Sequence, residues 1–324
     1  MKLPASFQAS VEKEITSFCK NLSAEPDELY APLRYTLALG GKRIRPNLLL
    51  LSCSLFKGNV KQALPVAIAI ELFHNFSLIH DDITDNAPLR RNKPSVHAKW
   101  NTNIALLSGD ALMIKAYEYI GKAPKDKLPV ILNLFNETAL KVCEGQQYDM
   151  NYETQQRVSI DDYLQMISLK TAALLSASLE MGAILGGASA KDIQSMKVYG
   201  ESIGMLFQLQ DDILDVFGEM EKVGKQTGGD IINNKKTYLL LKAFELAKGD
   251  TLKELNTLLN SYNISPAKKV KGVKDIYNEL KVVEHANKQM NKYHAAATKS
   301  LQTINAPGKN ILLDLSDALM SREI

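Results

Sequence analysis

The sequence predicts an all-α fold, and three observations support that prediction. Apolar residues recur at helical spacing over several long segments, which are 66–84, 104–120, 128–148, 161–186 and 192–217. Strand signals are scarce, because no segment alternates apolar and polar residues between Asn-Gly or Asp-Gly turns. The main helix breakers, such as Gly40-Gly41, Pro88 and Gly186-Gly187, fall between the helical segments.

The order of these elements along the chain indicates one domain. Segments 66–84 and 161–217 are apolar enough to form the centre of the core. The last part, 250–324, has the pattern of amphipathic helices that pack on that core. No linker rich in Pro, Gly and Ser divides the chain, and no repeat of 20–50 residues is present. We therefore expect a single domain over residues 1–324, a bundle of about ten or more helices.

Composition and charge narrow the class of protein. The chain has 324 residues, 39 of them basic and 36 acidic, and its net charge of +3 favours neither nucleic acid nor membrane surfaces. Its cysteines, Cys19, Cys53 and Cys143, match neither a disulfide framework nor a zinc site and suit a reducing cytosol. The first residues lack the apolar centre of a secretory signal, and stretches such as 172–188 read as too polar or too short for a membrane span. We expect a cytoplasmic protein with no membrane span and no nucleic-acid partner.

Two aspartate-rich motifs follow apolar helical segments. LIHDDITD at 78–85 carries Asp81, Asp82 and Asp85, and DDILD at 211–215 repeats the pattern. Residues four apart share one helix face, so Asp81 and Asp85 should point the same way, with Asp82 turned about 100° aside. Like charges at that spacing destabilise a helix, and a cation would offset the repulsion. Oxygen-only ligands favour a hard cation such as Mg²⁺, whereas the alternative is two solvated acidic helix ends.

Basic residues stand close to both motifs in the sequence. They lie in four segments, which are GGKRIRP at 40–46, LRRNKPSVH at 89–97, LKTA at 169–172 and GKQTGGDIINNKK at 224–236. Arginine binds phosphate with a two-pronged fork, and lysine supplies a point charge. Lys170 is hard to explain as a solvated side chain, because it interrupts the apolar run MISLKTAALLSASL. The combination indicates diphosphate groups held between metal ions and basic side chains, next to an apolar interior.

These motifs together resemble those of the trans-isoprenyl diphosphate synthases, the polyprenyl synthetase family, of short-chain type. The resemblance rests on GGKRIRP, FHNFSLIHDDITDNAPLRRNKPSVH, GQQYD, LKTAAL, GMLFQLQDDILD and GKQTGGDIINNKK, which follow the family's order from about residue 40 to 237. It implies an isoprenoid synthase fold around a central apolar cavity and a homodimer with one site per subunit. It also implies condensation of isopentenyl diphosphate with an allylic diphosphate, which is dimethylallyl, geranyl or farnesyl diphosphate.

The resemblance assigns a role to each matching residue. Asp81, Asp85 and Asp211 would bind Mg²⁺, three ions per site with substrate bound, and the metal site would be supported by Asp82, Asp212 and Asp215. The allylic diphosphate would contact Arg90, Lys170, Lys225 and Lys235. The isopentenyl diphosphate would contact Lys42, Arg45, His74 and Arg91. The reaction centre would be lined by Gln146, Asp149, Thr171, Phe207 and Gln208, of which Thr171 and Gln208, with Lys170, count as catalytic.

The sequence departs from the family pattern at two places. Asn92 stands where the family usually has glycine, and one extra residue separates Lys225 from Asp230. The second departure weakens the role of Lys225 more than it weakens the function.

The charges suggest a mechanism of ionisation, condensation and elimination. Mg²⁺ and the basic residues would neutralise the departing diphosphate, and the double bond of isopentenyl diphosphate would attack the allylic cation. Water must be excluded, which suits an apolar pocket. A class I terpene cyclase is the alternative enzyme, but it would leave GGKRIRP, His74 and Arg91 without a purpose. A non-catalytic subunit of a heteromeric synthase is a further alternative, although such subunits tend to have eroded motifs.

Product length should depend on the helix that carries Asp81. Ser77 and Phe76 stand four and five residues before Asp81, just over one helical turn deeper, and Phe73 lies one turn below Phe76. Ser77 would leave the upper tunnel open, and Phe76 would form its floor, although both rings could simply be core residues. In the resembling family, an aromatic residue only at the deeper position often accompanies a twenty-carbon product. We expect geranylgeranyl diphosphate first and farnesyl diphosphate second.

Overall fold

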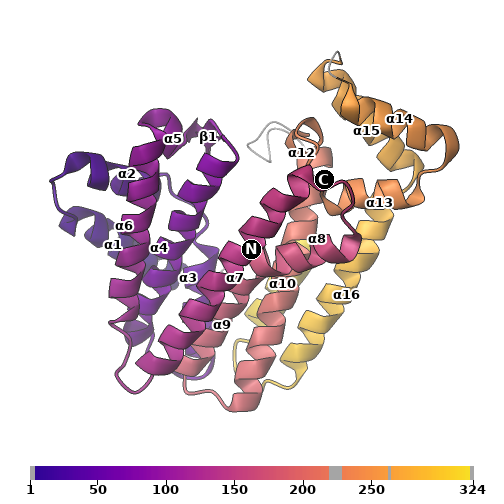
Figure 1. Ribbon diagram of the computed structural model, residues 1–324. Helices are drawn as coiled ribbons and strands as arrows, with labels where there is room; N and C mark the ends of the chain where they lie inside the picture. Colours follow the sequence, from indigo (N-terminus) through magenta and orange to yellow (C-terminus); the bar gives the residue numbers. More distant parts are fainter. Residues whose placement is uncertain (1–3, 219–227, 262–263, 322–324) are drawn as a thin grey trace. The chain divides into compact units, whose positions relative to one another are not determined.

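The structure, a computed structural model, describes residues 4–218, 228–261 and 264–321. Within these residues the chain is helical almost throughout, and the only strands form one short antiparallel ladder (Figure 1). The prediction of an all-α fold is therefore confirmed. The chain forms two compact units, each assembled from separate stretches of sequence. This division does not test the expectation of a single domain, which stays a prediction.

Unit one comprises Met1–Ala139, Leu174–Gly200 and Ser300–Leu312. Its complete helices are α1 (Ala5–Asn21), α2 (Asp27–Ala38), α3 (Ile44–Leu55), α4 (Val60–Thr84), α5 (Val96–Lys99) and α6 (Thr102–Ile120). The ladder pairs β1 (Leu89–Arg90) with β2 (Lys93–Pro94). Unit one also holds the beginnings of α7 (Leu128–Thr154) and α10 (Ala190–Phe217) and most of α9 (Ala173–Leu185).

Helix α4 is the centre of unit one, because it packs against both α3 and α6. Asn59 caps its first turn by accepting hydrogen bonds from the backbone N–H groups of Lys61 and Gln62. Most residues from Ala63 to Ile79 are buried, as the apolar segment 66–84 predicts. The last turn of this core helix carries the first aspartate motif, so its position is fixed by the packing of the whole helix.

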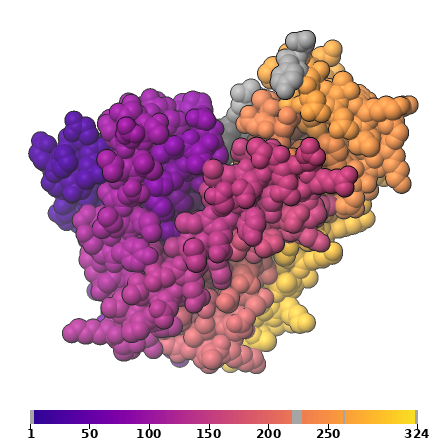
Figure 2. Space-filling model, in the orientation of Figure 1, coloured from indigo at the N-terminus to yellow at the C-terminus, as the bar shows by residue number. Residues whose placement is uncertain are grey.

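Unit two comprises Leu140–Ala173, Glu201–Lys299 and Leu313–Ile324. Besides parts of α7 and α10, its elements are α8 (Ile160–Ile167), the π-helical turn η1 (Ser168–Ala172), α12 (Gly229–Ile232), α13 (Tyr238–Leu246), α14 (Gly249–Asn260), α15 (Pro266–Glu279), most of α16 (Val282–Gln302) and the end of α17 (Asn310–Met320). Helices α14 and α15 pack against each other and lie in the orange region of Figure 2. The described part of segment 250–324 is thus mainly helical, as its amphipathic pattern predicts.

Two apolar segments, Val60–Thr84 and Ile160–Leu185, are long and apolar enough to cross a membrane by length and composition. From the sequence, the apolar stretches were expected to be too polar or too short for a membrane span. These two segments do not fit that expectation. In the most apolar window of each segment, 61% and 67% of the residues are buried inside the protein, so both are core helices. None of the three cysteines, Cys19, Cys53 and Cys143, is joined in a disulfide bond.

Candidate active site

The first aspartate motif ends α4 in unit one, and its three carboxylates differ in exposure. Asp82 is only 3% exposed, whereas Asp81 is half-buried and Asp85 is exposed. The Asp82 carboxylate accepts hydrogen bonds from Nε of Arg90, at 3.0 and 3.2 Å, and from Nη2 of the same guanidinium. Burial raises the pKa of Asp82, and the hydrogen bond from Arg90 acts against that shift. The middle aspartate thus holds an arginine, and the outer two remain on the more accessible side of the helix.

A tight turn between β1 and β2 places Arg90 and Arg91. The register pairs Arg90 with Lys93, so Arg91 and Asn92 form a two-residue turn, and both have positive φ, at 52° and 60°. Such a turn needs left-handed residues at both positions, which asparagine adopts readily. Asn92 can therefore replace the glycine of the family pattern. A Cβ on Gly41 would lie 2.8 Å from the Arg91 guanidinium, so this glycine leaves room for Arg91 beside the turn at 40–41.

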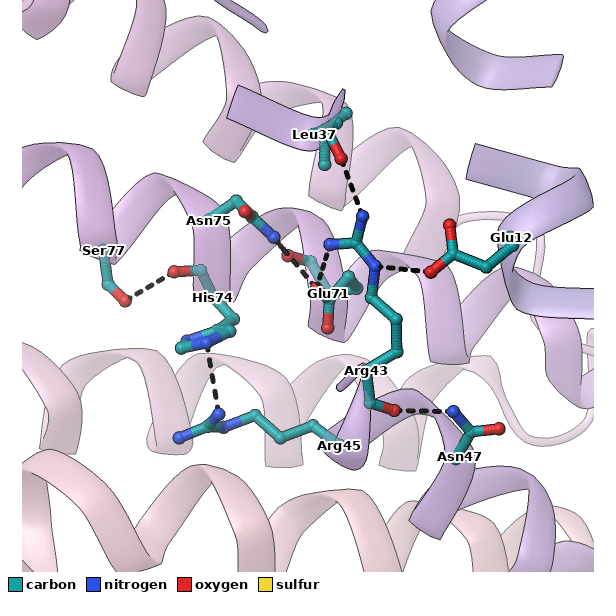
Figure 3. A network of polar contacts seen from close by, with 9 residues as sticks. All are labelled: Glu12, Leu37, Arg43, Arg45, Asn47, Glu71, His74, Asn75 and Ser77. Carbon is teal, nitrogen blue, oxygen red and sulfur yellow. Dashed lines mark hydrogen bonds and ion pairs between the residues drawn. The ribbon is translucent and has the colours of Figure 1, made fainter. Parts of the chain in front are cut away.

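Arg45 and His74 form the polar centre of unit one. Arg45 donates a hydrogen bond from Nη1 to Nε2 of His74, at 3.2 Å, so a neutral His74 carries its proton on Nδ1 (Figure 3). Burial, and then the charges of Arg45 and Arg91, lower the pKa of His74 well below 6.5. Burial also lowers the pKa of Arg45 to about 10 and lowers the pKa of Arg91. Several cations are thus gathered around a neutral imidazole, and an anion would stabilise them. Lys42, which belongs to the same GGKRIRP segment as Arg45, is exposed.

The second aspartate motif lies on α10 in unit two, and its second aspartate is again the buried one. Asp212 is 3% exposed, and Asp211 is exposed. The Asp212 carboxylate accepts hydrogen bonds from the Tyr163 hydroxyl and from Nε2 of Gln208 at 3.2 Å. Burial, and then the nearby charge of Asp230, raise the pKa of Asp212 to about 8. Asp215 differs from its counterpart, because its Oδ2 accepts the backbone N–H of Asp230 at 3.0 Å, in the first turn of α12.

The predicted catalytic residues Lys170 and Thr171 lie in η1, the π-helical turn. Such turns are rare and often occur at functional sites. Lys170 Nζ lies 2.6 Å from Oδ2 of Asp149, and Lys235 Nζ lies 3.9 Å from the same oxygen. Thr171 donates a hydrogen bond to Oε1 of Gln208 at 3.0 Å. Unit two therefore joins the LKTA, GQQYD and DDILD motifs in one polar cluster.

The remaining predicted site residues fall into three groups. Gln146 on α7 and Phe207 on α10 are half-buried in unit two. In unit one, Phe73 and Phe76 belong to an aromatic cluster, with ring centroids 5.4 Å apart, and Phe76 also lies 4.7 Å from the His80 ring. Ser77 is half-buried and donates a hydrogen bond to the backbone oxygen of His74. Lys225 lies outside the described residues.

Comparison with known proteins identifies the family. The polyprenyl synthetase family model matches residues 26–280. The chain belongs to the polyprenyl synthetase family. It is 35% identical over 308 residues to a geranylgeranyl diphosphate synthase of Methanosarcina mazei, covering 92% of this chain and 91% of that protein. It is 36% identical over 318 residues to a short chain isoprenyl diphosphate synthase of Methanocaldococcus jannaschii, covering 98% and 96%. A crystal structure of a geranylgeranyl pyrophosphate synthase superposes with a TM-score of 0.93 at 40% identity and full coverage of both chains.

This member of the polyprenyl synthetase family is a short-chain trans-prenyl diphosphate synthase, and hence a prenyltransferase of isoprenoid biosynthesis. Family membership implies isopentenyl and allylic diphosphates as substrates and Mg²⁺-dependent diphosphate chemistry. The residues present fit that metal. Among the described residues no three metal-binding side chains converge. Mg²⁺ does not need such a cage, because it takes one or two carboxylates together with water and substrate phosphates. Asp81, Asp85 and Asp211 provide accessible carboxylates of this kind.

Several residues of this polyprenyl synthetase take part in the polar clusters but escaped the sequence analysis. Tyr163 holds Asp212, and its hydroxyl cannot be recognised in an apolar helical run. Lys236 donates hydrogen bonds to the backbone oxygens of Tyr152 and Gln155 at the end of α7. Glu71 did give a signal, because it is a lone acid in the apolar run AIAIELF, one turn before His74.

Proposed function

We propose that this prenyltransferase elongates dimethylallyl, geranyl and farnesyl diphosphates and that its main product is geranylgeranyl diphosphate. The observation that carries the product assignment is the pair Phe76 and Ser77, a bulky and a small residue five and four positions before Asp81. The Phe76 ring is packed between Phe73 and His80, so it cannot turn aside easily to admit a longer chain. The relative from Methanosarcina mazei carries the same product in its name.

The isopentenyl diphosphate would be bound by Arg45, Arg91, Lys42 and His74. Three cations supply charge-assisted hydrogen bonds to the diphosphate oxygens, which are stronger than neutral ones. Burial, and then its cationic neighbours, lower the pKa of His74 and keep it neutral. It accepts a hydrogen bond from Arg45, so it orients that guanidinium without competing for the anion. This substrate is therefore bound without metal.

The allylic diphosphate would be bound by Lys170, Lys235 and Arg90, together with Mg²⁺ on Asp81, Asp85 and Asp211. Mg²⁺ held by these aspartates, three ions per site in our proposal, would neutralise the charge of the departing diphosphate. Asp149 keeps Lys170 in place before substrate arrives, and Thr171 with Gln208 lies beside the second motif. We assign the middle aspartates, Asp82 and Asp212, to the support of these ligands rather than to direct contact with metal.

The proposal includes the assembly and location of the enzyme. Helix α6 exposes Leu106, Leu107 and Ile114, with 47%, 60% and 62% of each residue accessible. Exposed apolar side chains on one helix are typical of a surface that another chain covers. We propose a cytoplasmic homodimer whose subunits meet at α6. Replacement of Leu107 by Glu should shift the sedimentation coefficient to that of a monomer.

One assay tests the function. The purified enzyme is incubated with radiolabelled isopentenyl diphosphate, Mg²⁺ and each allylic diphosphate in turn, and the dephosphorylated products are separated by thin-layer chromatography. A twenty-carbon prenyl alcohol from every starter is the expected result. A cyclic hydrocarbon from an allylic diphosphate alone would instead assign a terpene cyclase. Absence of any product would assign a non-catalytic subunit of a heteromeric synthase.

A further inference from the structure

A buried ionic network in unit one lies next to the residues assigned to isopentenyl diphosphate and is not itself part of that set. Arg43 and Glu71 are 3% and 2% exposed, and Nη1 of Arg43 lies 2.7 Å from Oε1 of Glu71 (Figure 3). The same guanidinium donates from Nε to Glu12 on α1, at 3.0 Å, and from Nη2 to the backbone oxygen of Leu37 on α2, at 2.7 Å. Arg43 therefore joins α1, α2 and α4 through three separate hydrogen bonds.

The backbone of Arg43 has an unusual conformation that this network stabilises. Its φ is 45°, in the left-handed region, where a residue other than Gly, Asn or Asp is strained. Arg43 is also the N-cap of α3, and its backbone oxygen accepts a hydrogen bond from Asn47 Nδ2 at 2.7 Å. The left-handed turn sets the direction in which α3 begins, and Arg45 is the second residue of that helix.

Glu71 connects the network to the anion-binding residues. It lies one helical turn before His74 on α4, and Asn75 donates from Nδ2 to both its carboxylate and its backbone oxygen. Its negative charge also acts on Arg45 and Arg91, where it partly offsets the fall in pKa that burial causes. The buried Nε of Arg45 has no hydrogen-bond partner among the described residues. Glu71 is thus a buried anion whose charge acts on two of the residues assigned to isopentenyl diphosphate, Arg45 and Arg91.

A purely structural explanation of this pair is weak. Replacing a buried ion pair by apolar residues of similar volume is often neutral or stabilising, so the pair is poor evidence for stability alone. Here the two charged residues precede the two partners of the Arg45–His74 contact in the chain. Arg43 fixes the turn before Arg45, and Glu71 fixes the helix before His74.

We infer that Glu71, acting through Arg43, is a positioning residue of the isopentenyl diphosphate pocket, and that Glu12 extends this control to the N-terminal helix α1. The inference rests on the function proposed above. Glu71 touches no substrate. It sets the geometry of Arg45 against His74 and supplies a counter-charge to Arg45 and Arg91.

Steady-state kinetics of three variants test the inference. Glu71→Gln keeps the shape of the side chain and removes its charge, and it should raise KM for isopentenyl diphosphate roughly tenfold or more while changing KM for the allylic substrate less than about twofold. Glu12→Gln removes the charge of the half-exposed carboxylate that binds Nε of Arg43. It should raise KM for isopentenyl diphosphate about threefold. Glu14→Gln is the matched control on α1, because Glu14 binds Tyr119 outside the network, and it should change neither KM.

A double variant tests whether the effect passes through Arg45. If Glu71 positions that guanidinium, Glu71→Gln should raise KM for isopentenyl diphosphate much less in an Arg45→Lys background than in the wild type. Should Glu71→Gln fail to fold in a circular dichroism melt, the Glu12→Gln and Glu14→Gln pair decides the question by the same comparison of KM values. Equal effects on both substrates, additive effects with Arg45→Lys, or no effect at all would overturn the inference. A wild-type enzyme that does not consume isopentenyl diphosphate would overturn the proposed function instead.

Discussion

Replacing Gly145 by alanine should disable the π-helical turn that carries Lys170. A Cβ at this position of α7 would lie 2.3 Å from the backbone nitrogen of Lys170 and 2.7 Å from its Cα. Real Cβ contacts essentially never fall below 3.0 Å, so helix and turn must separate by at least 0.7 Å. Neither neighbouring atom belongs to a flexible side chain, so the strain cannot be relieved locally. Overpacking of this kind costs about 1–3 kcal/mol of unfolding free energy.

The same displacement should reduce turnover more than it reduces stability. Lys170 would move relative to Asp149, and a misplacement of about 1 Å in a catalytic group can lower the rate on the order of a hundredfold. We expect kcat to fall roughly tenfold to a hundredfold. Urea denaturation and initial rates with saturating substrates measure the two effects.

Gly121→Ala is the matched control for this prediction. Its Cβ would meet only backbone oxygens of its own helix end, at 3.4 and 3.6 Å, so stability and activity should stay near the wild-type values. Wild-type stability and kcat in Gly145→Ala would show that the turn is not held by this glycine and would refute the reasoning.

Three further predictions address metal, pH and product length. Asp81→Ala and Asp211→Ala should each abolish turnover while circular dichroism shows unchanged helix content, and more than a tenth of wild-type activity would contradict their assignment to Mg²⁺. In metal-free enzyme the pKa of Asp212 is raised from 3.8 to about 8, so the folded state holds a proton that the unfolded state releases. The unfolding free energy from this group should fall as pH rises from about 4 to about 8, and Asp212→Asn should flatten that slope in urea titrations. Phe76→Ala should lengthen the product by at least one five-carbon unit, and Ser77→Phe should shorten it. A Phe76→Ala product that runs as the wild-type product on thin-layer chromatography would show that Phe76 is not the floor of the tunnel.

The sequence predicted the fold because helical periodicity is a local property. Helices formed by segments such as 66–84 and 192–217 bury one or more of their faces. The buried faces can be recognised in the sequence from the helical spacing of the apolar residues. The tight turn at Arg91 and Asn92 was not predicted, since two left-handed residues without glycine give no familiar turn signal. The π-helical turn at 168–172 was missed for a similar reason. Its local composition is that of an ordinary helix, and tertiary contacts with Gly145 and Gly204 accompany the altered spacing.

Site residues could be predicted where a charged group conflicts with an apolar environment. Lys170 and the aspartates were recognisable in this way, and the contacts of Lys170 with Asp149 join two motifs that are separate in sequence. The partners of those groups were harder to find. Tyr163 is an apolar-looking residue until its hydroxyl meets Asp212, and Arg43 appeared to be one more basic residue on a glycine turn. A partner is defined by a contact in space, and no spacing rule along one chain encodes it.

The two aspartate motifs show how helix geometry divides one pattern between chemistry and support. Adjacent residues on a helix point about 100° apart, so the first and second aspartates cannot both face the same surroundings. In each motif the second one, Asp82 or Asp212, is buried and bonded, and the first one is left more accessible. The last positions then diverge, because Asp85 is exposed while Asp215 receives the backbone N–H of Asp230. The first motif therefore offers two accessible carboxylates one turn apart, and the second offers one. The DD-x-x-D pattern that the two motifs share does not reveal this difference.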